Sequence, residues 1–255
     1  MNLTEKTIFI PGATSGIGLA LAGRLHRQGN TVIVGGRRVE LLEQNAADHP
    51  GIDTVQIDTA DAASITAAAA SVLARHPELN VLVTMAGIMR VEDWSTPAGF
   101  LSSAEETVTT NLLGPIRLTN ALIDHLVQQP DAVIVNVTSG LAFVPLVATP
   151  TYNATKAAIH SYTVAMREAL KGRVEVIELA PPAVQTGLTP GQESRPGYQP
   201  LDEFADEVMA LLSQVPTPPE ILVERVRFLR LAEAEGRFDQ TLTQLNEFAA
   251  KARGD

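Results

Sequence analysis

Two residues that can take part in proton chemistry, Tyr152 and Lys156, stand four positions apart. In a helix this spacing places both side chains on one face. Free tyrosine has a pKa of about 10 and is a poor base at neutral pH unless a neighbouring cation favours its phenolate form. Lys156 can supply that positive charge. Because such a pair is often only structural, its significance depends on the other motifs of the chain.

A serine, Ser139, ends the apolar run that precedes this pair, within Val137-Thr138-Ser139-Gly140. If that run is a strand of an open α/β fold, its last residue lies at the carboxyl edge of the sheet, where such folds bind their ligands. A hydroxyl there could hold a carbonyl oxygen.

A glycine-rich turn, Pro11-Gly12-Ala13-Thr14-Ser15-Gly16-Ile17-Gly18, joins the first apolar run to a helical pattern. Its three glycines allow the backbone to approach a pyrophosphate, whose charge would meet free N–H groups and the positive end of the helix dipole. The spacing is G-x-x-x-G-x-G rather than G-x-G-x-x-G, and a tight structural turn is the alternative. Its place in the first strand-to-helix turn favours dinucleotide binding.

The second apolar run ends in Gly35-Gly36-Arg37-Arg38, where a dinucleotide-binding fold places the adenosine ribose. An acid there would bind the two ribose hydroxyls of NAD, whereas arginine offers a planar fork to a 2′-phosphate. Paired surface arginines are often only solvated. In a chain of net charge −10 without an acid at this turn, however, Arg37 and Arg38 favour NADP.

The third apolar run leads into Asp58 and Thr59, from which a side chain could reach adenine. Capping of the next helix is the alternative role for this aspartate. Asp61 is better placed to be that cap.

Six short β-branched runs alternate with segments of helical periodicity. We predict buried strands at residues 7–10, 31–34, 54–57, 81–84, 132–137 and 174–179, and helices at 17–28, 39–47, 62–75, 102–127 and 152–170. This alternation predicts an α/β fold, a Rossmann-type doubly wound parallel β-sheet flanked by helices. The rival (β/α)₈ barrel needs eight strands, and the glycine-rich turn is typical of an open sheet.

Prolines and glycines are dense over residues 181–200, which predicts a loop. We interpret residues 187–200 as a lid over a ligand, with a linker as the alternative. A helix is expected at 202–212, and an atypical tail at 216–255 contains a short strand at 220–223 and helices at 225–235 and 240–252. The whole chain, residues 1–255, is predicted to be one domain.

Composition excludes several classes of protein. The chain has no cysteine, which excludes disulfides, thiolate nucleophiles and cysteine-ligated metals. Its net charge of −10 argues against nucleic acid and anionic membranes as partners. Because no signal peptide or long apolar stretch is evident, we expect a cytoplasmic protein. The five histidines form no H-x-x-x-H pair, so no metal site is predicted.

Taken together, these motifs resemble the short-chain dehydrogenase/reductase family over residues 3–190. Gly12, Gly16 and Gly18 match its glycine motif. Ser139, Tyr152 and Lys156 match its catalytic trio, Asn111 its helix asparagine, and Arg37 its NADP-selecting position.

The chain departs from the family pattern at three places: Pro11 replaces a threonine, Thr84-Met85-Ala86-Gly87 replaces Asn-Asn-Ala-Gly, and Pro181-Pro182 replaces Pro-Gly. Met85 cannot make the polar contact of the asparagine, but backbone groups of residues 85–87 could still line the cofactor. Residues 182–186 and the tail are similar to a subgroup named for oxidoreductases encoded beside lipoteichoic-acid D-alanylation genes.

The resemblance implies an NADP(H)-dependent oxidoreductase that transfers a hydride to or from a carbonyl or secondary alcohol carbon. Catalysis would rest on Asn111, Ser139, Tyr152 and Lys156. The implied cofactor contacts are Gly12, Thr14, Ser15, Gly16, Ile17, Gly18, Arg37, Arg38, Asp58, Thr59, Met85, Ala86, Gly87, Tyr152, Lys156, Pro182, Val184 and Thr186.

In this reading Tyr152 donates a proton to the oxygen, Ser139 hydrogen-bonds it, and Lys156 adjusts the tyrosine and holds the nicotinamide ribose. Asn111 supports a proton path from Lys156 to water. We expect a relatively apolar ketone or aldehyde, in a pocket lined by residues 88–100, 138–150 and 187–200. Trp94 and Phe100 either cap this pocket or anchor their loop.

Two other functions stay open, namely a non-redox epimerase or lyase of the same fold and a cofactor-binding scaffold or sensor. By the resemblance, the helices at 102–127 and 152–170 pair across a two-fold axis, so a homo-oligomer is expected. The tail lacks the usual Val-Asp-Gly-Gly turn, so a dimer is favoured over a tetramer.

Overall fold

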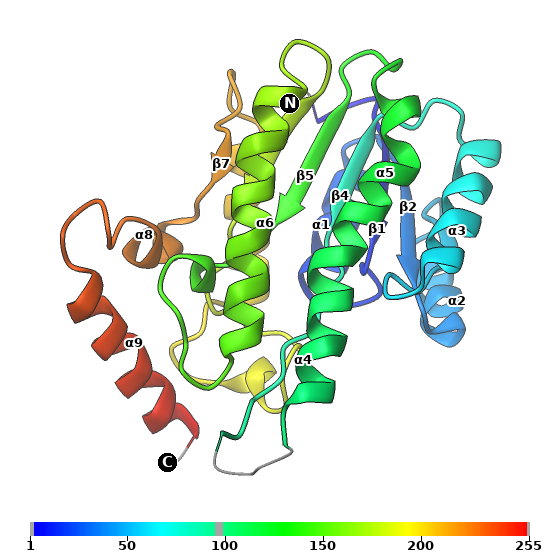
Figure 1. Cartoon of the computed structure of the whole chain (residues 1–255). Helices are drawn as coiled ribbons and strands as arrows, with labels where there is room; N and C mark the ends of the chain where they lie inside the picture. The colour runs from blue at the N-terminus through cyan, green and yellow to red at the C-terminus, as the bar shows by residue number, and fades with distance from the viewer. Residues whose placement is uncertain (1–2, 95–98, 254–255) are drawn as a thin grey trace.

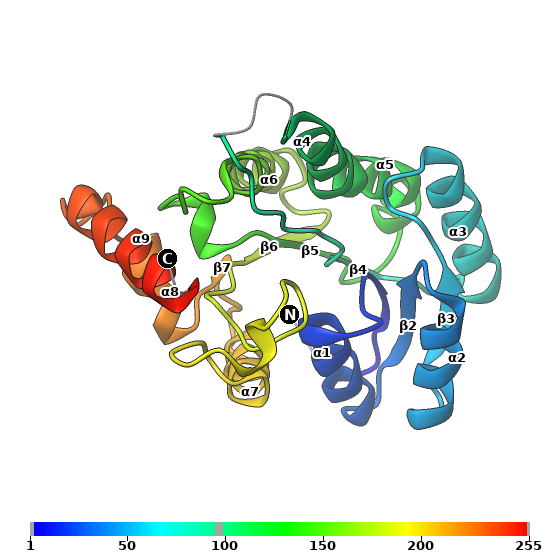
Figure 2. The ribbon, with the colours of Figure 1, turned by 90° about the horizontal axis from the view of Figure 1, so that it is seen from below.

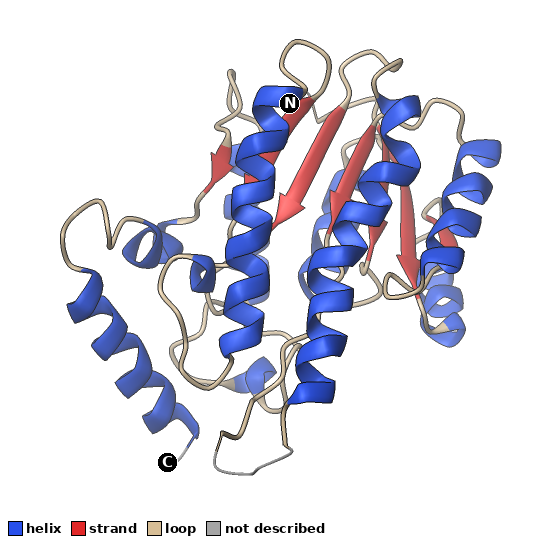
Figure 3. Ribbon diagram, in the orientation of Figure 1, coloured by secondary structure: helices blue, strands red, loops and turns tan. Residues whose placement is uncertain are grey.

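The computed structural model describes residues 3–94 and 99–253, and these form a seven-stranded parallel sheet between helices (Figures 1 and 3). The strands are β1 (Thr7–Pro11), β2 (Thr31–Gly36), β3 (Asp53–Gln56), β4 (Val81–Thr84), β5 (Val133–Val137), β6 (Glu175–Leu179) and β7 (Glu220–Ile221). The predicted doubly wound fold is confirmed. The short strand predicted at 220–223 is β7, which pairs with β6 at the edge of the sheet.

The helices cover both faces of the sheet. They are α1 (Gly16–Arg27), α2 (Val39–Asp48), α3 (Ala62–Arg75), α4 (Leu101–Val108), α5 (Gly114–Leu126), α6 (Pro150–Ala169), α7 (Leu201–Leu212), α8 (Glu224–Arg230) and α9 (Phe238–Arg253). Figure 2 shows α1, α2 and α7 on one face, and α3, α4, α5 and α6 on the other. Helices α8 and α9 lie beyond the β7 edge.

Apolar clusters fill the space between the sheet and each helix layer. One includes Leu21 of α1 and Phe204 of α7, and the other includes Ile65 of α3 and Leu122 of α5. Burying a side chain of this size contributes about 1.5–3 kcal/mol. Because both faces are covered, central strands such as β1 and β4 read as mainly apolar runs, which is why the sequence predicted them.

The strand order β3-β2-β1-β4-β5-β6-β7 reverses direction between β1 and β4. In open α/β sheets the crevice at such a switch point, outside the carboxyl ends of the strands, is where ligands bind. The loops that follow β1, β4, β5 and β6 all emerge at this edge, which faces the viewer in Figure 2.

The helix predicted at 102–127 is interrupted. A π-helical turn at Thr109–Leu113 separates α4 from α5. Pro115 has no N–H, so the ordinary helical hydrogen bond to the carbonyl of Asn111 cannot form there, and the wider turn accommodates this. Asn111 therefore lies in a local distortion of the helix.

The tail packs on its own chain. Val144, Leu229 and Ala232 form a small cluster against which Leu242 and Leu245 of α9 are packed. Helix α8 ends at Arg230, earlier than predicted, because the chain turns toward Gly236, whose φ is +67°. Within the part of the chain that the structure describes, no helix is both long and apolar enough to cross a membrane.

Candidate active site

A cavity of about 470 Å³ opens at the carboxyl edge of the sheet. The glycine-rich turn, the ends of β2 to β6 and the start of α6 contribute to its wall. Among the predicted site residues it is lined by Gly12, Thr14, Ser15, Gly16, Ile17, Gly18, Arg37, Arg38, Asp58, Thr59, Met85, Ala86, Gly87, Ser139, Tyr152, Lys156, Pro182, Val184 and Thr186. Asn111 is buried behind this wall.

The glycine-rich turn is shaped by close backbone approaches. Gly12 has φ +90°, and a Cβ added there would lie 2.5 Å from the Cα of Ala86. A Cβ on Gly18 would lie 2.7 Å from the Cα of Ala13. Both positions therefore need glycine because backbone fills the space that a side chain would occupy.

The N-terminus of α1 is open toward the cavity. Its N-cap residue, Ser15, makes no side-chain capping hydrogen bond, and the first turn contains no acidic residue. The first N–H groups of a helix lack partners within the helix and attract anions. The residues present thus fit a pyrophosphate, as the glycine spacing predicted.

Arg37 extends from the end of β2 with 60% of its side chain exposed. The carboxylate of Asp58 lies 4.0 Å from its guanidinium. Asp58 also accepts a hydrogen bond from the N–H of Ala60 at 2.9 Å. The predicted helix cap is Asp61, which accepts from the N–H of Ala63 at 2.9 Å. Arg37 is therefore only loosely paired and accessible to a ligand.

The loop after β4 lines the middle of the cavity. The side chain of Met85 packs against the apolar core, so residues 85–87 approach the cavity without a polar side chain. A Cβ on Gly87 would lie 3.4 Å from Oδ1 of Asn111 and 3.7 Å from Nζ of Lys156. Gly87 thus faces both of these polar groups.

The hydroxyl groups of Tyr152 and Ser139 share a hydrogen bond. Ser139 also accepts a hydrogen bond from the N–H of Leu141 at 3.1 Å, and this fixes its side chain at the start of the turn that follows β5. Their separation of 13 positions in the sequence could not predict this contact. The fold brings the two residues together because the start of α6 lies beside the end of β5 in space.

Lys156 lies 5.6 Å from the centre of the Tyr152 ring and donates a hydrogen bond to the carbonyl of Val137 at 2.8 Å. Burial raises the pKa of Tyr152 to about 12 and lowers that of Lys156 to about 8. The sequence led us to expect a lowered tyrosine pKa. For Tyr152 the result is the opposite, because desolvation penalises the charged form of both groups.

The side-chain amide of Asn111 holds the loop after β4. Oδ1 accepts from the N–H of Ile88 at 2.8 Å, and Nδ2 donates to the carbonyl of Ile88 at 2.8 Å. Nδ2 also lies 3.4 Å from the hydroxyl of Thr155, one position before Lys156. Asn111 therefore connects the distorted helix to the cavity wall rather than forming that wall itself.

Three residues of the predicted lid at 187–200, namely Gly187, Leu188 and Gln192, line the cavity. Gln192, which sequence reasoning did not single out, lines the cavity and donates hydrogen bonds to the carbonyl of Val184 at 2.7 Å and to Thr186 at 3.1 Å. Val184 also pairs with Gln199 through a β-bridge. Both ends of this segment are thus attached to the loop that leaves β6.

Two aromatic residues follow β4 in the loop predicted at 88–100. Trp94 and Phe100 stack with 4.9 Å between ring centres, and 68% of Trp94 is exposed. Neither lines the cavity, which favours the anchoring role, while residues 95–98 lie outside the described residues. Arg90, within the segment 88–100 that was predicted to line the pocket, does line the cavity. Thr110 lines it as well and was missed by sequence reasoning, because nothing in its local pattern indicated a position on the cavity wall.

Comparison with known proteins supports the same interpretation. A family model for short chain dehydrogenases matches residues 6–196. The uncharacterized oxidoreductase DltE of Bacillus subtilis (strain 168) is 39% identical over 254 residues, which cover 96% of this chain and 100% of the relative. This agrees with the subgroup expected from the sequence.

Solved structures show the same fold. The 3-ketoacyl-(acyl-carrier-protein) reductase from Brucella melitensis, complexed with NADH, aligns with a TM-score of 0.76 at 26% identity, covering 86% of this chain and 96% of the reductase. The alcohol dehydrogenase from Thermococcus sibiricus, complexed with 5-hydroxy-NADP, aligns with a TM-score of 0.74 at 28% identity, covering 84% and 92%.

Proposed function

The chain belongs to the short-chain dehydrogenase/reductase family of oxidoreductases, and from this premise we propose that it is an NADP(H)-dependent enzyme that interconverts a carbonyl compound and a secondary or primary alcohol. The observation that carries the proposal is the hydrogen bond between Tyr152 and Ser139 on the wall of the cavity that the open N-terminus of α1 also faces.

A bound nicotinamide cofactor would supply the hydride, and the protein would supply position and proton transfer. The N–H groups at the start of α1 would hold the pyrophosphate, and residues 85–87 would line the cofactor through their backbone. Lys156, whose ammonium group faces Gly87, would hold the nicotinamide ribose. These residues fit a nicotinamide dinucleotide because the helix N-terminus and Lys156 attract its negative charge, and because Gly12 and Gly18 have no side chain where backbone segments come close together.

In the reductive direction, Tyr152 would donate its proton to the carbonyl oxygen while Ser139 hydrogen-bonds the same oxygen. With its pKa raised to about 12, Tyr152 is protonated near neutrality, which is the state that a proton donor needs. Lys156 would hold its positive charge beside the tyrosine and stabilise the phenolate that proton donation leaves. Asn111 would support the return of a proton through Lys156, as well as holding the loop at Ile88.

The preference for NADP(H) over NAD(H) rests on Arg37. Its guanidinium is accessible and only loosely paired, and it stands where a fork-shaped donor can meet a 2′-phosphate. The structures of the relatives named above contain NADH in one case and 5-hydroxy-NADP in the other, so the preference must come from this chain's own residues.

We propose a ketone or aldehyde of largely apolar character as the substrate. Ile88, Pro181 and Leu188 line the cavity together with Ser139 and Tyr152. Apolar walls with a few fixed polar groups are usual for small-molecule sites. Arg90 adds one positive charge to the lining, so oxo acids belong in the same panel of compounds as simple ketones.

The test of this function is the loss of NADPH absorbance with a panel of aldehydes, ketones and oxo acids. We expect turnover with at least one carbonyl compound and formation of the corresponding alcohol in equal amount. NADPH binding without net oxidation by any compound, but with isomerisation or elimination of a substrate, would instead indicate a non-redox enzyme.

We also propose a homo-oligomer, with the dimer favoured over the tetramer, formed by the α4–α5 segment and α6. Exposed Leu113 and Val164 on this segment and on α6 support such a contact. The tail packs Leu242 and Leu245 on its own chain, which favours a dimer. Light scattering should give a dimeric mass, and a monomeric mass contradicts the helix pairing. We propose a cytoplasmic location, in keeping with a chain without cysteine.

A further inference from the structure

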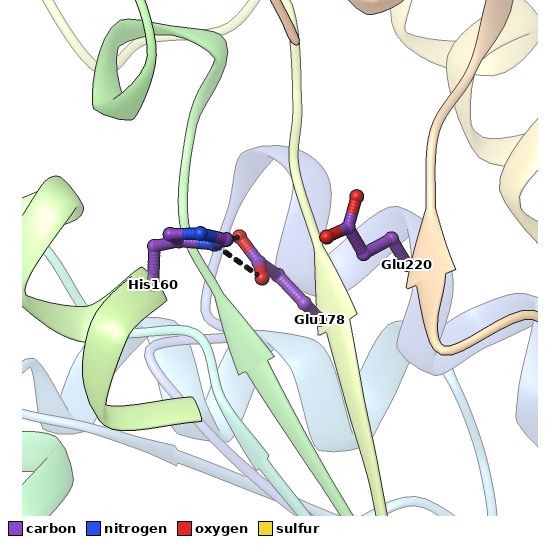
Figure 4. A group of neighbouring side chains, drawn as sticks. All are labelled: His160, Glu178 and Glu220. Atoms are coloured by element: carbon purple, nitrogen blue, oxygen red, sulfur yellow. Dashed lines mark hydrogen bonds and ion pairs between the residues drawn. The ribbon is translucent and has the colours of Figure 1, made fainter. Parts of the chain in front are cut away.

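A polar cluster of His160, Glu178 and Glu220 lies between α6 and the strands β6 and β7 (Figure 4). Its centre is Glu178 of β6, whose side chain is 1% exposed. The carboxylate accepts a hydrogen bond from the hydroxyl of Thr138 at 2.7 Å and another from Nδ1 of His160 at 2.8 Å. Because a carboxylate only accepts, Nδ1 of His160 must carry a hydrogen.

A second carboxylate stands beside the first. Glu220 of β7 is in register with Glu178, and their carboxylates and the ring of His160 lie within 4.8 Å of one another. Arg230 of α8 donates two hydrogen bonds to Glu220, at 2.8 and 2.9 Å. The pKa of Arg230 is raised, mainly because of these hydrogen bonds, and the negative charge of Glu178 raises it further. The arginine therefore balances the two neighbouring acids.

A cation site is the competing interpretation of His160, Glu178 and Glu220. Arg230 already occupies both oxygens of Glu220 with its own positive charge, which would repel a metal ion. Thr138 and His160 likewise occupy Glu178. Because both carboxylates have their donors, the geometry favours a structural network over a metal site.

This network contacts the chain on both sides of Ser139. Before it, Thr138 is hydrogen-bonded to Glu178. After it, Phe143 contacts two members of the network. The ring of Phe143 lies 4.9 Å from that of His160, edge to face, and 4.6 Å from the guanidinium carbon of Arg230.

Three successive residues at the end of β5 thus have three different partners. The carbonyl of Val137 accepts from Lys156, the hydroxyl of Thr138 donates to Glu178, and the hydroxyl of Ser139 bonds with Tyr152. The Val137 and Ser139 contacts belong to the proposed catalytic group. Thr138 also lines the cavity, but its hydroxyl is bonded to Glu178, and this bond holds the residue directly before Ser139.

We propose that Glu178 is a positioning residue for Ser139: its buried carboxylate, held by His160, fixes Thr138 and thereby orients the hydroxyl of the next residue toward the substrate. The expected effect on the reaction rate rests on the proposed function, carbonyl reduction. The expected effect on the position of the Ser139 hydroxyl does not depend on it.

The kinetic test is a double-mutant cycle between Thr138→Val and Ser139→Ala. Thr138→Val keeps the shape of the side chain but removes the donor. It should lower kcat about tenfold in the otherwise unchanged enzyme, with KM for NADPH within about twofold, and by less than about twofold in the Ser139→Ala background. Thr138→Ser, which restores a hydroxyl, should recover kcat to within about threefold.

Thr163→Val is the matched control, since Thr163 is also a buried threonine that shares a hydrogen bond with a strand residue, Asn136, but does not line the cavity. It should lower the denaturation midpoint as Thr138→Val does while leaving kcat unchanged. Equal fold-losses from Thr138→Val in both backgrounds would overturn the proposal. So would activity that is lost on EDTA treatment and restored by Zn²⁺ or Mn²⁺, because the cluster would then be a cation site.

Crystal structures of the variants test the same inference without turnover. In Thr138→Val and in Glu178→Gln, we expect the Ser139 hydroxyl to leave its hydrogen bonds with Leu141 and Tyr152. If the hydroxyl keeps both bonds in both variants, the proposal is wrong. Should the unchanged enzyme oxidise no NADPH with any carbonyl compound, the proposed function fails and this structural comparison alone decides the inference.

Discussion

The side-chain amide of Asn111 pairs with both backbone groups of Ile88, each at 2.8 Å. Asn111 thus joins the π-helical turn, in which it lies, to the loop after β4. Because residues 85–88 of the same loop line the cavity, this part of the wall is held in place from the helix behind it.

Replacing Asn111 with leucine should therefore damage the loop as well as any proton path. It leaves the N–H and the carbonyl of Ile88 without partners, which should lower the free energy of unfolding by about 2–4 kcal/mol. Asn120→Leu, at an exposed position on α5, is the control and should change it by less than about 0.5 kcal/mol. Urea denaturation measures both, and equal midpoints for the two variants would contradict the role of the Asn111–Ile88 pair.

Gly12 and Gly29 offer a matched test of the glycine-rich turn. Their φ values are nearly the same, +90° and +87°, but a Cβ at Gly29 meets nothing within 4 Å. Gly29→Ala should lower the free energy of unfolding only by the backbone strain, about 1–2 kcal/mol. Gly12→Ala should lower it by at least about 2 kcal/mol more, because the new Cβ would displace Ala86 from the cavity wall. The same displacement should weaken NADPH binding. Denaturation curves and NADPH fluorescence titrations with similar results for both variants would exclude this account.

Arg37→Ala should raise KM for NADPH about ten- to a hundredfold, the loss expected for a hydrogen bond to a charged group. KM for NADH should change by less than about threefold, because NADH has no 2′-phosphate. Arg38→Ala serves as the comparison and should have the smaller effect. Steady-state kinetics with both cofactors measure this, and equal use of NADPH and NADH by the unchanged protein would refute the assignment.

Activity should fall as the pH rises through about 8. Burial lowers the pKa of Lys156 to about 8, so its positive charge is present below this pH and is lost above it. Tyr152, with a pKa of about 12, stays protonated throughout this range. The profile of kcat/KM for NADPH reports groups of the free enzyme and should show the decline. Lys156→Arg should remove the decline at a lower overall rate, and an unchanged profile in this variant would assign it to another group.

Much of the fold was predictable because parallel strands covered on both faces are buried along their length and are therefore mainly apolar, as β1 and β5 are. The cavity residues contributed by the glycine-rich turn followed from their place after the first strand. The interruption of the helix at Asn111 was missed, although Pro115 provided the local signal.

The polar cluster around Glu178 could not be predicted from the sequence. A glutamate within an apolar strand carries no indication of its partners, and His160 and Arg230 reach it only through the packing of α6 and α8. The pKa shifts of Tyr152 and Lys156 were missed for a related reason, because spacing along a helix says nothing about how deeply both groups are buried.

The central claim, that Tyr152 is the proton donor in carbonyl reduction, is tested most directly by Tyr152→Phe. The variant keeps the ring and removes only the hydroxyl, so NADPH affinity by fluorescence titration should stay within about twofold. With a carbonyl substrate that the unchanged enzyme reduces, kcat should fall at least a hundredfold, since general acid catalysis contributes about 10²–10⁴-fold. A variant that binds NADPH normally and keeps more than about a hundredth of the rate would contradict the account.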